Sequence, residues 1–125
     1  MLQNSNIIFF SLFQVVKKVD SGNIFLRTKL KLNGTELYDE LRKKQAETIL
    51  NLIKKFLFKY PLIKSSVQSG KTNYNKRRYP RDSELDINKN IKSQFNLMRV
   101  SDNEKFPIFF YHKSVKYILK IFKDL

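Results

Sequence analysis

A short segment of the chain combines cationic and aromatic side chains in a pattern that suits RNA. Guanidinium groups fork onto phosphate oxygens, and tyrosine rings stack on unpaired bases. Lysines and arginines are interleaved here with Tyr74 and Tyr79, either of which could equally pack against protein. Further cations follow downstream. The predicted RNA contacts are Lys71, Tyr74, Lys76, Arg77, Arg78, Arg81, Lys89, Lys92 and Arg99.

The overall charge supports a polyanionic partner. The chain has 125 residues and a formal net charge of +14, from 25 Lys and Arg against 11 acidic residues. Such an excess destabilises a compact chain by self-repulsion unless a polyanion neutralises it. Nucleic acid is the expected partner, and an anionic membrane surface is the alternative.

Residues that carry catalysis or hold metals are scarce. The chain has no Cys and one His, which leaves little for thiol chemistry, nucleophilic catalysis or metal binding. Ser69-Gly70-Lys71-Thr72 ends like a phosphate-binding loop but lacks the upstream glycine. We therefore expect no enzymatic activity, no cofactor, no metal and no small-molecule substrate.

The segment at the N-terminus is the most apolar part of the chain. Residues 7–16 read IIFFSLFQVV, too short to span a bilayer, and are closed by Lys17 and Lys18. We interpret residues 1–22 as an N-terminal extension that supplies an added strand. A membrane anchor is the alternative interpretation of this segment. It is the weaker one, because the net charge predicts nucleic acid as the partner.

The next elements follow from hydrophobic periodicity. Residues 23–32 alternate apolar with polar or cationic side chains, which predicts a strand with one buried and one cationic face. Apolar residues then recur at helical spacing from about residue 35 to 58, after a capping pair formed by Asn33 and Glu36, with Thr35 as the alternative cap. Residues 61–67 are short and apolar enough for a second strand.

The remaining elements complete the predicted architecture. Residues 95–100 and 106–111 read as strands, and Ser114 is expected to cap a final helix. The basic loop at about 68–92 then projects as a hairpin extension. The order predicts an α+β fold, a ferredoxin-like split βαβ sandwich with a long basic hairpin loop, as one domain over residues 23–125.

Several motifs resemble the universal small-subunit ribosomal protein S ten family. Its loop-to-strand signature is matched by Asn88-Lys89, Lys92, Gln94-Phe95 and Leu97. Weaker matches are Glu36-Leu37-Tyr38-Asp39, Glu47-Thr48 and Lys113-Ser114-Val115, in the family's order. The chain departs from the family around Tyr60-Pro61 and Met98-Arg99-Val100, and it lacks the last family strand.

The resemblance implies a structural role in the head of the small ribosomal subunit. The basic loop would contact rRNA and neighbouring proteins of the S three and S fourteen families. Frequent Lys, Asn, Ile, Phe and Tyr, with AT-rich codons, indicate a mitochondrial ribosome, with a plastid or an AT-rich microbial cytoplasm as alternatives. A basic accessory subunit of an organellar membrane complex is the alternative function.

Overall fold

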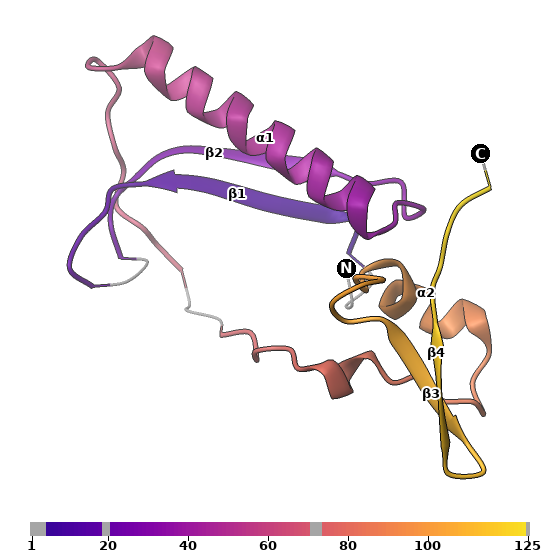
Figure 1. The fold of residues 1–125 in the computed structure, drawn as a ribbon. Helices are drawn as coiled ribbons and strands as arrows, with labels where there is room; N and C mark the ends of the chain where they lie inside the picture. Colours follow the sequence, from indigo (N-terminus) through magenta and orange to yellow (C-terminus); the bar gives the residue numbers. More distant parts are fainter. Residues whose placement is uncertain (1–4, 19–20, 71–73, 125) are drawn as a thin grey trace. The chain divides into compact units, whose positions relative to one another are not determined.

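The computed structural model describes residues 5–18, 21–70 and 74–124 (Figure 1). The chain divides into two compact units, each of which is built from separate stretches of sequence. Unit one contains residues 1–6, 32–42 and 75–125, and unit two contains residues 7–31 and 43–74. The predicted contact Lys71 lies outside the described residues.

Unit two is built on an antiparallel hairpin. Strand β1, Ile7–Phe13, pairs with strand β2, Ile24–Lys31, in a register that places Ile8 opposite Leu30. This is the segment for which an added strand is expected from the sequence. The backbone approaches closely at Gly22, where a Cβ atom would lie 1.7 Å from the Gln14 carbonyl oxygen. A side chain at that position would push the two strands apart.

The two faces of β2 differ as its alternation predicts. Ile24 is buried, while Arg27, Lys29 and Lys31 are exposed. Helix α1, Tyr38–Lys59, has its first residues in unit one, and its remainder lies along the hairpin within unit two (Figure 1). The Phe25 and Phe56 rings meet there edge to face, with centroids 5.2 Å apart. The predicted strand at 61–67 is reduced to a bridge, in which Ser66 and Ile24 exchange two backbone hydrogen bonds of 2.8 Å.

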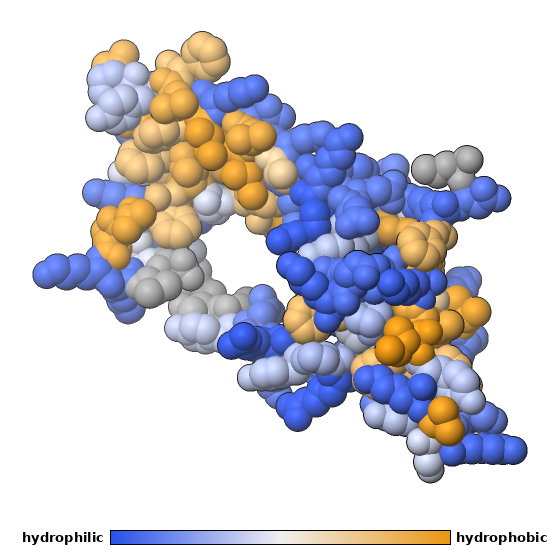
Figure 2. Space-filling model, viewed as in Figure 1, coloured by the Kyte–Doolittle hydropathy of each residue, from blue (hydrophilic) through white to orange (hydrophobic). Residues whose placement is uncertain are grey.

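The start of α1 is fixed by acidic side chains. Glu40 Oε2 accepts a hydrogen bond of 2.8 Å from the amide of Leu37, which precedes the helix. This is the carboxylate half of a capping box, and it satisfies an amide that has no partner within the helix. The C-terminal part of α1 exposes apolar side chains instead, including Leu50, Leu57 and Phe58 (Figure 2).

Unit one contains the remaining elements. These are a 3-10 helix η1 at Pro80–Ser83, helix α2 at Ile91–Arg99, and strands β3 at Ile108–His112 and β4 at Val115–Leu119. Ile108 and Phe109 are its most buried apolar residues on β3. The chain after η1 joins β3 through the amide of Leu85, which donates to the Phe109 carbonyl at 2.7 Å.

The strand predicted at residues 95–100 is wrong, because this segment belongs to α2. Asn90 caps the helix, accepting a hydrogen bond of 2.8 Å from the Ser93 amide through its side chain. Phe95, Met98 and Arg99 then follow at helical spacing. Only Phe95, Asn96 and Leu97 alternate, and three residues are too few to exclude a helix. No strand therefore returns at residues 95–100 to form the predicted hairpin.

The helix predicted from Ser114 is also wrong. Residues 115–119 form β4, which pairs with β3 and places His112 opposite Val115. The turn consists of Lys113 and Ser114, both with positive φ, of 47° and 63°. Two such residues match the twist of a two-residue hairpin turn. Stacked rings of Phe110 and Tyr117, with centroids 5.3 Å apart, reinforce the pairing.

The fold class is α+β, as predicted. Its described strands form two separate two-stranded antiparallel sheets, accompanied by the two α-helices. The finer prediction of a ferredoxin-like sandwich is not confirmed, since β2 and β3 do not share a sheet. Within the described ranges, no helix has the length and apolar character needed to cross a membrane.

We expect Ile108→Ala to lower the free energy of unfolding by about 2–5 kcal/mol, because it leaves a cavity around a residue that is 1% exposed. Urea denaturation measures this change. Ile118→Ala on the paired strand is the matched control, since Ile118 is 60% exposed and its loss should cost less than about 0.5 kcal/mol. Equal costs for the two variants would contradict the placement of the core.

Candidate functional site

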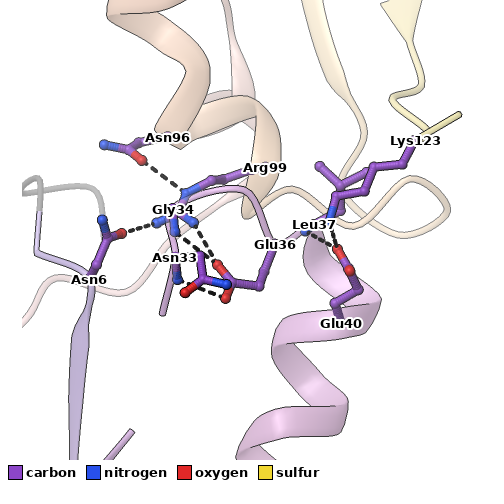
Figure 3. A network of polar contacts seen from close by, with 9 residues as sticks. All are labelled: Asn6, Asn33, Gly34, Glu36, Leu37, Glu40, Asn96, Arg99 and Lys123. Carbon is purple, nitrogen blue, oxygen red and sulfur yellow. Dashed lines mark hydrogen bonds and ion pairs between the residues drawn. The ribbon is translucent and has the colours of Figure 1, made fainter. Parts of the chain in front are cut away.

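A buried guanidinium organises the polar centre of unit one (Figure 3). Arg99 has 0% exposure. Its Nη1 lies 3.4 Å from Glu36 Oε2, its Nε donates to Asn96 Oδ1 at 2.9 Å, and its Nη2 donates to Asn6 Oδ1 at 2.6 Å. The side chain is therefore held by partners on three separate segments, which offsets its removal from water.

Glu36 forms the other half of this network. The sequence-predicted pair of Asn33 and Glu36 is in contact, because Glu36 Oε1 accepts from the Asn33 amide at 2.9 Å, but it does not cap α1, which begins at Tyr38. Oε2 accepts from the Gly34 amide at 3.0 Å. Gly34 has a φ of 91°, a left-handed conformation that favours glycine. The structure thus places Arg99 in the interior, where its guanidinium is inaccessible to a phosphate.

A second ion pair fixes the end of the chain to the start of α1 within unit one. Lys123 Nζ donates to Glu40 Oε2, the same carboxylate that accepts from the Leu37 amide (Figure 3). The Lys123 ammonium, and then the Leu37 amide, lower the pKa of the Glu40 carboxyl. Its charged form is therefore favoured in the folded chain.

The predicted RNA contacts on residues 77–81 form an exposed arginine–tyrosine cluster, made of Arg77, Tyr79 and Arg81. The Arg77 and Arg81 guanidinium carbons lie 5.9 Å and 5.3 Å from the centroid of the Tyr79 ring. The Tyr79 amide donates to Asp82 Oδ2 at 2.6 Å, which anchors the ring at the start of η1. Two cations thus meet one aromatic ring on a fixed piece of backbone.

Of the other predicted contacts, Lys76, Lys89 and Lys92 belong to unit one and Tyr74 belongs to unit two. Tyr74 is 91% exposed, and Lys76 is exposed beside the cluster. Lys92 lies in the first turn of α2, and Lys89 lies 3.7 Å from Asp86 in an exposed ion pair. Among the described residues, no hydrogen bond, ion pair or ring contact joins these four side chains to the arginine–tyrosine cluster, so the structure groups only part of the predicted set.

A small cavity of about 140 Å³ opens next to the cluster. Its lining combines aromatic rings with charged and hydroxyl side chains: Tyr38, Arg78, Tyr79, Ser83, Val100, Ser101, Asp102 and Phe106. Among these lining residues, only Arg78 and Tyr79 were predicted from the sequence to contact RNA. The missed signal is Ser101-Asp102-Asn103, a cluster of turn-forming residues directly after α2.

Asp102 is the acidic group of this cavity. Its Oδ1 accepts hydrogen bonds from the amides of Glu104 at 2.9 Å and Lys105 at 3.1 Å. These amides, with a smaller contribution from the Tyr38 hydroxyl, lower the pKa of the Asp102 carboxyl. The cavity therefore offers a carboxylate acceptor and the Arg78 donor between aromatic walls. Nowhere in the described ranges do three His, Cys, Asp or Glu side chains come together as a metal site.

The chain is similar in fold to solved formyltransferases. No family model matches its sequence, and no curated protein matches it. A methionyl-tRNA formyltransferase from Clostridium thermocellum matches 95% of this chain over 52% of its own, with a TM-score of 0.67 and 20% identity. A 4-N formyltransferase from Francisella tularensis matches 91% of this chain over 51% of its own, with a TM-score of 0.59 and 18% identity.

A third match is a sugar N-formyltransferase from a Shewanella species. The match covers 89% of this chain and 48% of the Shewanella chain, with a TM-score of 0.63 and 15% sequence identity. The chain therefore spans about half the length of these solved structures.

These likenesses overturn the ribosomal interpretation. The matched folds are those of formyltransferases, so the S ten resemblance, the rRNA and the S three and S fourteen partners are wrong. The expectations of no enzymatic activity and no small-molecule substrate are wrong on the same ground. Nothing favours the membrane-complex alternative either. The signature around Asn88 failed because it was read as a loop entering a strand, whereas it caps and begins α2.

We expect Arg99→Ala to lower the free energy of unfolding by about 3–5 kcal/mol, because it removes the cation that neutralises the buried Glu36 carboxylate. Chemical denaturation measures the loss. Arg77→Ala removes the same group from an exposed position and should cost less than about 0.5 kcal/mol. The double variant Arg99→Met with Glu36→Gln should recover part of the loss. A cost below 1 kcal/mol for Arg99→Ala would contradict the network.

The lowered pKa of Glu40 gives a stability term that depends on pH. This term is present above the unfolded-state pKa, about 4.3 for Glu, and is lost as the pH falls through the lower folded-state pKa. Glu40→Gln should therefore flatten the decline of the unfolding free energy with acid in that window. Lys123→Gln should flatten it as well, because Lys123 is the main cause of the shift. A decline as steep as in the unmodified protein would contradict this assignment.

Proposed function

We propose that this chain forms part of an enzyme that transfers a formyl group to an amino group. The observation that carries the proposal is the fold likeness, which extends over 89% or more of the chain in a methionyl-tRNA formyltransferase, a 4-N formyltransferase and a sugar N-formyltransferase. Because the chain spans about half of each, we assign to it a part of the catalytic machinery. The exposed apolar side chains of α1 fit a chain that functions together with further protein.

The chemistry of such a transfer sets what the whole enzyme must supply. The amine nitrogen attacks the carbonyl carbon of an N-formyl donor, and the new C–N bond produces a tetrahedral oxyanion. The bond from that carbon to the donor nitrogen then breaks, and the proton lost by the amine passes to the departing nitrogen. A general base and hydrogen-bond donors for the oxyanion accelerate this sequence.

The described residues supply acceptor binding in this proposal. The similar structures include a methionyl-tRNA formyltransferase and a sugar N-formyltransferase, which formylate methionyl-tRNA and sugars. The net charge of +14 and the exposed arginine–tyrosine cluster favour the polyanionic acceptor, an aminoacylated RNA. The exposed cations of unit one then bind the phosphates of this acceptor instead of rRNA, namely Lys76, Arg77, Arg81, Lys89 and Lys92. Arg99 is left out because it is buried.

An isotope-labelled formyl donor tests the proposal with the protein as it occurs in cells. We expect label to be transferred to the amino group of methionyl-tRNA, and more slowly to an amino sugar, as followed by mass spectrometry of the acceptor. Absence of transfer to either amine would overturn formyl transfer. Faster transfer to the sugar would overturn the choice of acceptor.

The arginine–tyrosine cluster is tested by Arg77→Ala combined with Arg81→Ala. We expect a higher KM for the RNA acceptor with little change in kcat, and a salt dependence of binding whose logarithmic slope is smaller by about 2. Lys29→Ala with Lys31→Ala removes the same charge from β2 and serves as the matched control. Equal effects from the two double variants would show that only net charge matters.

A further inference from the structure

The cavity beside the arginine–tyrosine cluster has the walls of a site for a flat ring. Tyr38, Tyr79 and Phe106 supply aromatic surface around a volume of about 140 Å³. Tyr79 and Phe106 remain 49% and 45% exposed, so a ligand ring can reach them from solvent. Aromatic side chains bind unstacked bases through such surfaces.

The polar groups of the cavity have hydrogen-bonding capacity left. Arg78 uses Nη2 for its two contacts, with the Asp82 carbonyl at 3.3 Å and Ser83 Oγ at 3.4 Å. A guanidinium carries five N–H donors, so Nε and Nη1 can face a ligand. The Asp102 carboxylate accepts from two amides and the Tyr38 hydroxyl, and its two oxygens provide about four acceptor positions.

The walls are held before any ligand arrives. Ser83 is 1% exposed and its hydroxyl donates to the Phe106 carbonyl at 3.4 Å. Ser101 is 3% exposed and donates to the Leu97 carbonyl at 2.8 Å. The hydroxyls of Ser83 and Ser101 thus hold in place the backbone segments that carry the aromatic and charged lining residues. Preorganised walls reduce the ordering cost of binding.

We propose that this cavity binds the base of a guanine nucleotide. Guanine is the base whose O6 and N7 acceptors suit an arginine and whose N2 amino group suits a carboxylate, so it uses Arg78 and Asp102 together. The arginine–tyrosine cluster at the rim then faces the attached phosphate. The same chemistry is present in a free guanine nucleotide and in an unpaired guanosine of RNA.

Calorimetric titration of the protein with GMP, AMP, CMP and UMP tests the proposal without any formyl donor, so its outcome is separate from that of formyl transfer. We expect GMP to bind at least about 5-fold more tightly than the other three. Equal affinities for the four nucleotides would overturn the proposal. It would also be overturned if GMP does not bind and the protein binds RNA with no preference for guanine.

The source of the nucleotide is distinguished by a five-residue RNA with one central guanine and its counterpart with adenine. Preference for the guanine strand, with competition by GMP, identifies an RNA residue as the ligand. Binding of GMP alone identifies a free nucleotide. Both results support the cavity as a guanine site.

Two substitutions tie the preference to the cavity. Arg78→Lys keeps the charge but loses the fork, and should remove most of the preference for GMP, whereas Arg27→Lys on β2 is the matched control and should not. Asp102→Asn should shift the preference from guanine toward adenine, because an amide pairs with the N6 and N7 groups of adenine. Circular dichroism of each variant checks its fold, and a GMP preference that survives in folded Arg78→Lys and Asp102→Asn would contradict the assignment.

Discussion

Removal of one guanidinium from water is the constraint on which unit one depends. A buried arginine costs several kcal/mol unless an opposite charge and further hydrogen bonds compensate for it. Arg99 meets this requirement only when Asn6, Glu36 and Asn96 are all in place. Asn6 precedes β1, Glu36 precedes α1, and Asn96 lies on α2. The contacts of Arg99 therefore fix three distant parts of the sequence in one arrangement. No buried side-chain N or O atom within the described ranges lacks a hydrogen-bond partner.

Local signals predicted the elements that depend mainly on local chemistry. The alternation of β2 and the long apolar period of α1 were sufficient, because each extends over enough residues to separate a period of 2 from one of 3.6. The prediction for residues 95–100 failed because three alternating positions are compatible with both periods, and the Asn90 cap decides for a helix. Residues 115–119 failed because the turn at Lys113 and Ser114 contains neither Gly nor Asn, the usual residues at positive φ.

The candidate site shows a different limit of sequence reasoning. Composition identified Arg77, Arg78 and Arg81 as available cations, and the structure does expose them. Composition could not separate these three arginines from Arg99, because an exposed arginine and a buried, ion-paired arginine look the same in the local sequence. The decisive information is Glu36, 63 residues away along the chain. Asp102 was missed for a related reason, since its cavity forms only when α1, η1 and the segment after α2 converge.

Charge is therefore a guide to a class of ligand and a poor guide to the assembly that uses it. A basic segment with interleaved aromatic rings fits any partner that carries phosphates. Such a segment is expected both in a ribosomal protein and in an enzyme that acts on RNA. Fold likeness argues against the ribosomal interpretation because it depends on how strands and helices are connected, which is retained at 20% identity. The specificity of the site then rests on the few side chains, Arg78 and Asp102 above all, that the fold brings to one cavity.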